Sequence, residues 1–199
     1  MESQEQSITM PEPRLIVPPC GAMTAHAFRL HPGEKLMPAL KQAAEIILAR
    51  SKCESAFIVT AVGSLERATI RLAANASLKD GDDTGGNDIK TYNQRFEIVS
   101  LVGTFSADGS GCHVHISLSD AEGNTIGGHL MDGTIFTTCE IVMGTADSVK
   151  FTRTMDDSTG YNELEVIQLP EQQSDAWKAI PAALMILAAG FIAGRLKAR

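Results

Sequence analysis

Residues 113–130 read HVHISLSDAEGNTIGGHL and begin with a strictly alternating stretch. Val114, Ile116 and Leu118 alternate with polar residues, which is the period-two pattern of a strand with one buried face. Gly123 then takes the third position of a three-residue loop, where a type I turn followed by a left-handed residue favours glycine. The stretch therefore predicts an antiparallel β-hairpin.

The position of the loop also predicts the register of this hairpin. Leu118 would face Ile126 on the apolar side, and His115 would face His129 on the other side, with His113 two residues away. Directly opposed side chains in an antiparallel pair have Cβ atoms roughly 4.5–5.5 Å apart. We therefore expect three of the five histidines of the chain to share one face of one hairpin.

Similar patterns predict the remaining elements, which are a helix near 35–51 and strands at 26–31, 57–62, 68–73, 96–105, 137–143 and 161–169. The run 57–62 is almost continuously apolar and predicts a buried strand. Gly63, Gly103 and Gly144 are expected at turns where apolar strands end. Together these elements predict one α+β domain at 23–169, mainly an antiparallel sheet with a packed helix.

Composition limits the classes of function. A chain of 199 residues that is 44% hydrophobic suits one domain, and its net charge of −7 argues against a large nucleic-acid footprint. The four cysteines have no CxxC spacing, so reduced thiols in a reducing compartment are expected. Residues 1–22 begin with a polar, acidic stretch without a secretory signal and are predicted to be a disordered arm.

The last segment, 170–199, combines a linker with an apolar run. This run, Ala179–Gly194, is sixteen residues long and lies between Trp177 and a basic end. It is slightly shorter than the 17–25 residues usual for a spanning helix. We expect residues 177–195 to form a membrane anchor that leaves the domain in the cytosol, and the alternative is a helix packed on the domain or its oligomer.

Four motifs in order resemble the PPC ("plants and prokaryotes conserved") domain family over about residues 23–168: QRFEIVSLVGTF (94–105), the histidine stretch, TTCEIVMG (137–144) and STGYNELEV (158–166). The resemblance implies an antiparallel sheet with a packed helix, assembled as a homotrimer. Plant members carry a basic AT-hook that binds DNA. This chain contains no such element and resembles the free-standing prokaryotic type, in which three histidines are zinc ligands. Those histidines correspond to His113, His115 and His129.

The chemistry of imidazole is consistent with such a site, because three protein nitrogens plus one exogenous ligand make an open zinc centre. The plainer alternative is that these histidines are polar strand residues. An enzyme would also need a base, for which Glu97, Asp120 and Glu140 are candidates, although strand alternation favours Glu140 as a buried structural carboxylate. Ser117 and Ser119 share the histidine face, but no third residue completes a Ser–His arrangement.

Arg95 and Glu97 begin one of the family-like motifs. The resemblance places this segment near subunit contacts, so either residue is a candidate for pairing across an interface. The alternative is an ordinary strand with an exposed ion pair that contributes little.

These observations favour a trimeric binding or regulatory module with a histidine zinc site. Three classes stay open: a DNA-associated regulator, a zinc-dependent enzyme or small-ligand binder, and a scaffold trimer without metal.

Overall fold

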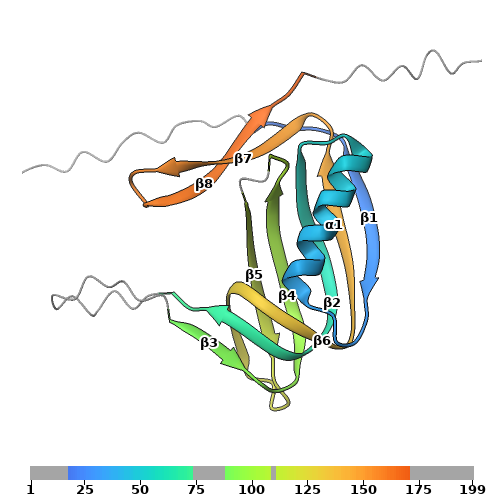
Figure 1. Ribbon diagram of the computed structural model, residues 1–199, viewed down its shortest axis with the longest axis vertical. Coiled ribbons are helices and arrows are strands. Elements are labelled where there is room, and N and C mark those ends of the chain that lie inside the picture. Colours follow the sequence, from blue (N-terminus) through green and yellow to red (C-terminus); the bar gives the residue numbers. More distant parts are fainter. Residues whose placement is uncertain (1–17, 74–87, 109–110, 171–199) are drawn as a thin grey trace, which may run out of the picture.

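The computed structural model describes residues 18–73, 88–108 and 111–170. The elements within them are β1 (Met23–Leu30), α1 (Leu36–Ser51), β2 (Ser55–Arg71), β3 (Ile89–Tyr92), β4 (Phe96–Ser106), β5 (Cys112–Ser119), β6 (Thr125–Ala146), β7 (Val149–Asp156) and β8 (Tyr161–Gln168). Figure 1 shows one helix lying against a mainly antiparallel sheet, which confirms the predicted architecture.

The main sheet has the strand order β1-β6-β5-β4-β2-β3, with a further pairing between β6 and β2. That extra pairing closes a circuit through β2, β4, β5 and β6, so both edges of these four strands are largely paired. The circuit depends on two long strands, β2 with 17 residues and β6 with 22. Register shifts in their pairing allow both strands to bend around the core.

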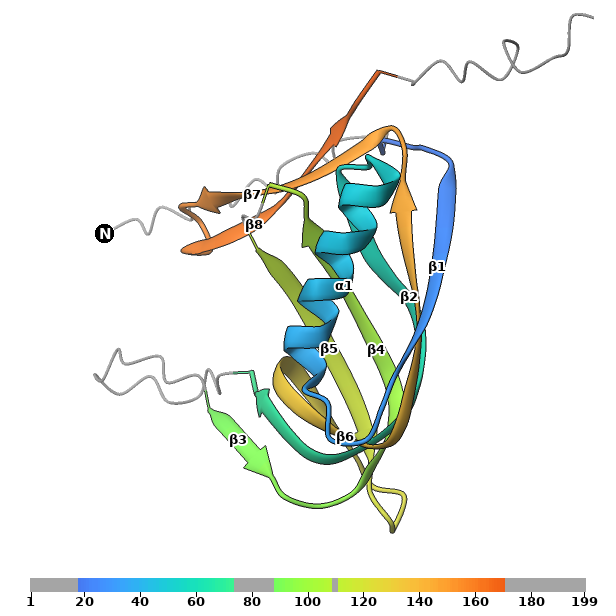
Figure 2. The ribbon, with the colours of Figure 1, turned by 45° about the vertical axis from the view of Figure 1, so that its right-hand side comes forward.

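Helix α1 covers the core, and both ribbon views place it along the strands of the main sheet (Figure 2). Pro38 is its third residue, where the missing N–H costs no hydrogen bond. The helix ends at Ser51, and its C-cap Lys52 adopts the left-handed conformation with φ of 56°. Its buried residues recur at helical spacing and are Leu36, Met37, Leu40, Ala44, Ile47 and Leu48. The predicted amphipathic helix is confirmed.

The predicted turns at Gly63, Gly103 and Gly144 are wrong, because all three glycines lie inside strands. Glycine is needed at each position because a neighbouring strand or an aromatic ring lies too close to leave room for a side chain. A Cβ on Gly63 would lie 2.2 Å from the backbone oxygen of Thr138, and one on Gly144 would lie 2.6 Å from the Phe57 ring. Consequently the separately predicted strands on either side of Gly63 are one continuous strand, β2.

The predicted buried strand 57–62 is also wrong in one respect. Ile58 is buried, but Val59 and Val62 are 45% and 60% exposed. Their side chains point to the side of the sheet away from the core. On the neighbouring strand β4, Val99 and Val102 are 59% and 51% exposed. Two adjacent strands therefore present apolar side chains to the surface.

Strands β7 and β8 form a separate two-stranded hairpin that projects from one end of the main sheet (Figure 1). The N–H of Phe151 donates to the backbone oxygen of Glu54 at 2.9 Å, and the Phe57 and Phe151 ring centroids are 6.4 Å apart. The sequence predicted β8 but neither β7 nor β3.

The predicted arm 1–22 and C-terminal segment 170–199 fall almost entirely outside the described residues. The described part of the arm is bonded to the domain, because Gln168 accepts from the N–H of Cys20 at 2.8 Å. Within the described ranges, no helix is long and apolar enough to cross a membrane. The predicted anchor at 177–195 lies outside these ranges and stays a prediction.

Candidate metal centre

The hairpin of β5 and β6 has the predicted register. His115 pairs with His129, and Leu118 pairs with Ile126. Gly123 has a φ of +83°, as a left-handed loop position requires. The N–H of Gly123 donates to the oxygen of Asp120 at 3.1 Å and closes the turn.

Asp120 stabilises this turn with its carboxylate. Its Oδ1 accepts from the backbone N–H of Glu122 at 3.1 Å and from that of Asn124 at 2.8 Å. Its Oδ2 accepts from the Asn124 side-chain amide at 3.2 Å. Asp120 therefore holds the hairpin that carries the histidines, and its carboxylate lies at the far end of β5 from them.

We expect Asp120→Ala to lower the free energy of unfolding by about 1 kcal/mol, because the turn loses two backbone partners of a charged acceptor. The pairing of His115 with His129 should not change, since this register is fixed by the ladder itself. Asp120→Asn is the matched control, because its side-chain oxygen can still accept both bonds. Chemical denaturation measures the effect, and an Asp120→Ala protein as stable as the wild type would contradict the role of this carboxylate in the turn.

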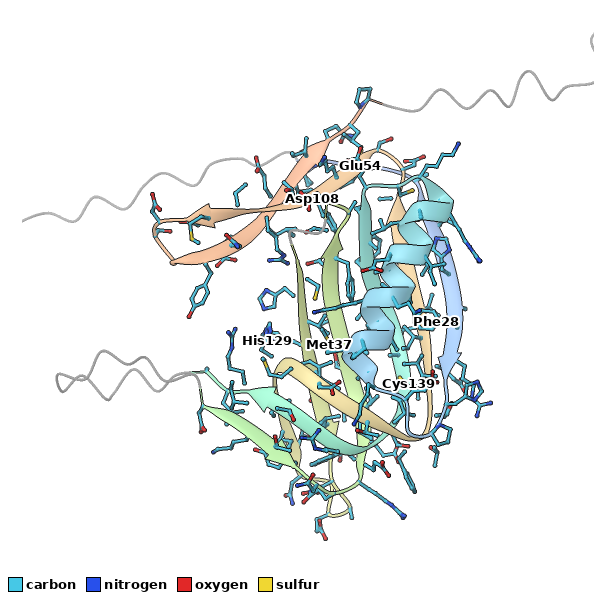
Figure 3. The ribbon with its side chains drawn as sticks, viewed as in Figure 1. Phe28, Met37, Glu54, Asp108, His129 and Cys139 are labelled. Atoms are coloured by element: carbon cyan, nitrogen blue, oxygen red, sulfur yellow. The ribbon has the colours of Figure 1, made fainter. Side chains whose placement is uncertain are left out.

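The three histidines gather on the side of β5 and β6 away from the core. The ring centroids of His113 and His115 are 4.8 Å apart, those of His113 and His129 are 5.0 Å apart, and those of His115 and His129 are 5.6 Å apart. The Nε2 atoms of His113 and His115 are 3.0 Å apart. One ring nitrogen from each of the three histidines can be chosen so that all three lie within 4.8 Å of one another. Figure 3 shows His129 in the region between the β7–β8 hairpin and β3.

The surroundings favour neutral imidazoles. The pKa of His129 is lowered to about 4, first by burial and then by the nearby charge of Arg71. The pKa of His113 is lowered by burial and then by the neighbouring His115. The Nδ1 of His129 is shielded from solvent and has no hydrogen-bond partner among the described residues. Neutral imidazole is the form that binds metals.

The β7–β8 hairpin adds residues to this surface that the sequence did not predict. Together with β4 and β5 it encloses a shallow hollow of ≈ 280 Å³ beside His113 and His115. Its lining consists of Val102, Gly103, Thr104, His113, His115, Arg153, Glu163 and Leu164. The alternation in VKFTRTMD could have indicated β7, but nothing in the sequence placed it against β4.

The other predicted site residues lie elsewhere. Glu97 pairs with Ser119, at the turn end of β5, and is exposed. Glu140 is exposed and pairs with Arg29 and Val62, so the expectation of a buried carboxylate is wrong. Its side chain points outward because Cys139 and Ile141, its neighbours along β6, are the residues that face the core.

The other candidates also have local roles or none. The guanidinium of Arg95 lies 3.9 Å from the ring centroid of Phe136, which gives it a packing role within the chain. Ser119 donates weakly to the oxygen of Asp120 at 3.4 Å. No hydrogen bond joins Ser117 or Ser119 to a histidine in the described ranges. None of these residues belongs to the histidine group.

Comparison with known proteins supports the resemblance seen in the sequence. The profile of the Plants and Prokaryotes Conserved (PCC) domain matches residues 18–147. A curated relative from Synechococcus sp. (strain JA-2-3B'a(2-13)), the bifunctional protein GlmU, is 36% identical over 164 residues. That alignment covers 82% of this chain but only 23% of the relative, so the chain spans under a quarter of that protein.

Solved structures share the fold. A hypothetical protein from Salmonella cholerae-suis has a TM-score of 0.61 at 27% identity, over 75% of this chain and 96% of its own. A plant- and prokaryote-conserved protein from Pyrococcus horikoshii has a TM-score of 0.58 at 24% identity, over 77% and 100%. A metal-containing protein from Archaeoglobus fulgidus has a TM-score of 0.53 at 25% identity, over 74% and 94%.

Proposed function

The chain belongs to the Plants and Prokaryotes Conserved domain family. We propose that it is a trimeric binding module with a zinc ion held by His113, His115 and His129. The convergence of these three imidazoles on one face of the β5–β6 hairpin is the observation that carries the proposal. The metal-containing relative from Archaeoglobus fulgidus supports it further.

The residues fit zinc in their chemistry and spacing. Zinc binds histidine nitrogen at about 2.0–2.1 Å, so two nitrogens on one tetrahedral ion lie roughly 3.3 Å apart. The 3.0 Å between the Nε2 atoms of His113 and His115 is close to that separation. If one nitrogen of His129 binds the ion, its other nitrogen normally bonds a carbonyl, a carboxylate or water. The Nδ1 of His129 is shielded from solvent and has no partner among the described residues. A metal ion bound at this nitrogen would supply one.

A three-histidine site leaves room for a further ligand. When zinc is bound in such a site, it acts as a Lewis acid toward an oxygen ligand at the remaining position. The protein contributes the shallow hollow beside His113 and His115, into which a small molecule can enter. This arrangement favours a binder of small ligands over a purely structural metal site, which would be fully enclosed by protein ligands.

Metal analysis of the purified full-length protein tests the assignment. We expect close to one zinc per chain after purification without added metal. Exhaustive dialysis against a chelator should remove it, and added zinc should restore the same stoichiometry. A chain that takes up no zinc at micromolar concentrations would contradict the proposal.

We also propose that the trimer is formed through the exposed apolar side chains of β2 and β4. Val59, Val62 and Val99 are between 45% and 60% exposed on adjacent strands. Contiguous apolar surface of this kind usually marks an interaction site. Glu97 and Glu140 lie beside this surface and are candidates for polar contacts at its rim.

We expect at most weak binding to DNA. The net charge of −7 and the absence of an AT-hook in the sequence leave only the non-specific range, about 10⁻⁴–10⁻⁶ M at physiological salt. Fluorescence anisotropy with short labelled duplexes of different sequence, at two salt concentrations, measures this. Tight, sequence-selective binding at physiological salt would restore the DNA-associated regulator as the leading function.

A further inference from the structure

Arg153 on β7 extends over the sheet toward the histidines. Its Nη2 donates to the hydroxyl of Thr104 at 3.0 Å, and its Nη1 donates to the backbone oxygen of Asn162 at 3.3 Å. A guanidinium carries five N–H donors. Its Nε is shielded from solvent and has no partner in the described part of the chain. Neutral oxygens thus hold the guanidinium in place while most of its donors stay free.

No ion pair joins Arg153 to a carboxylate among the described residues. The ion pairs found among the described residues join Lys90 to Asp88 and Lys150 to Glu54, and Arg153 is in neither. Arg71 is likewise unpaired there, and it lies in register with His129 on the other side of the cluster. In a chain with a net charge of −7, two arginines without an ion pair in the described ranges thus lie on either side of the histidines. Such an arrangement attracts anions.

The lining of the hollow beside Arg153 limits the chemistry of the anion. The hollow is shallow and widely open to solvent, and its volume of ≈ 280 Å³ has room for a small molecule. Val102 and Leu164 give it apolar walls, whereas Thr104 and the two histidines are polar. Glu163 lines the same hollow, and its negative charge disfavours ligands that carry several negative charges.

We propose that this hollow binds a small monocarboxylate. Its carboxylate oxygens accept hydrogen bonds from the guanidinium of Arg153, since arginine pairs with carboxylates in bidentate geometry. Its short carbon chain packs against Val102 and Leu164. The histidines that line the hollow belong to the proposed zinc centre. Contact of the ligand with that side therefore rests on the proposed function, whereas binding of the carboxylate rests on Arg153 alone.

Isothermal titration of the full-length protein with propionate tests the site, in zinc-loaded and in chelator-treated protein. We expect saturable binding with a Kd of about 1 mM, in the range of weak small-ligand sites. Arg153→Gln should weaken it roughly ten- to a hundredfold, as expected for the loss of charge-assisted hydrogen bonds. Arg50→Gln is the matched control, because it removes an exposed arginine from the last turn of α1 and should bind as the wild type does.

The Arg153→Gln protein should keep its zinc, because Arg153 is not a ligand. Circular dichroism checks its fold, and Arg153→Lys, which keeps the charge but loses the planar fork, should bind with intermediate affinity. If Arg153→Gln does not fold, the comparison of Arg153→Lys with Arg50→Gln decides.

Three results would overturn the carboxylate site: no saturable binding of propionate, equal affinity in the wild type and the Arg153 variants, or preference for inorganic phosphate over propionate. The metal assignment fails separately. Binding that depends on Arg153 in a protein that takes up no added zinc would support the carboxylate site while contradicting the zinc centre. Full zinc occupancy together with binding that does not depend on Arg153 would support the zinc centre and contradict the carboxylate site.

Discussion

The His115→Ala protein is expected to purify with almost no zinc, whereas the wild type carries close to one ion per chain. His115 is next to both other histidines, because it pairs with His129 in register and its Nε2 lies 3.0 Å from that of His113. Two imidazoles that remain on a solvent-exposed face hold zinc far more weakly than three do. Metal analysis after dialysis against zinc-free buffer measures the loss.

The fold of the His115→Ala protein should persist. The backbone of β5 is paired on one side with β4 and on the other with β6, and Val114 and Ile116 remain buried. Far-ultraviolet circular dichroism should therefore match that of the wild type after chelation. His31→Ala is the matched control, because His31 lies outside the cluster and should leave the zinc content unchanged. Full zinc occupancy in His115→Ala would refute the assignment of the site.

Val62 lies in the apolar surface that we propose as the trimer interface. We expect Val62→Lys to convert the trimer to monomers, because an ammonium group buried in an apolar contact costs several kcal/mol at each subunit interface. In the free chain the new lysine would lie opposite Glu140 on β6, where opposite charges are favourable, so the fold itself should be stable. Light scattering coupled to gel filtration measures the mass.

A matched control separates this effect from a general effect of charge. Ile46 on α1 is 44% exposed, and Ile46→Lys places the same side chain on a different surface. The Ile46→Lys protein should have the mass of the wild type, about three chains. A wild-type protein that is monomeric at micromolar concentrations, or a Val62→Lys protein that stays trimeric, would contradict the proposed interface.

The sequence predicted the histidine hairpin well because its signals are local. Alternation fixed which side chains face the core, and Gly123 fixed the loop and so the pairing of His115 with His129. Helix α1 was predictable for the same reason, since its apolar spacing is contained in sixteen residues.

The errors arose where the structure depends on contacts between distant segments. Gly63 looks like the end of a strand, but it allows β2 to approach the backbone of Thr138, 75 positions later in the chain. Arg153 could not be placed beside the histidines because the position of β7 depends on Glu54 and Thr104. Val59 and Val62 looked like core residues because an apolar run has the same composition whether its side chains face the interior or the surface.

Strand β6 is a single 22-residue segment that pairs with β5 near His129 and with β1 near its end. His129 is paired on both sides, with His115 of β5 and with Arg71 of β2, and beyond it β6 continues to pair with β2 and, near its end, with β1. A metal ion bound by the three histidines would therefore be held from a backbone that is paired on both sides at His129, while the imidazole side chains themselves move on the much shorter time scale of rotamers.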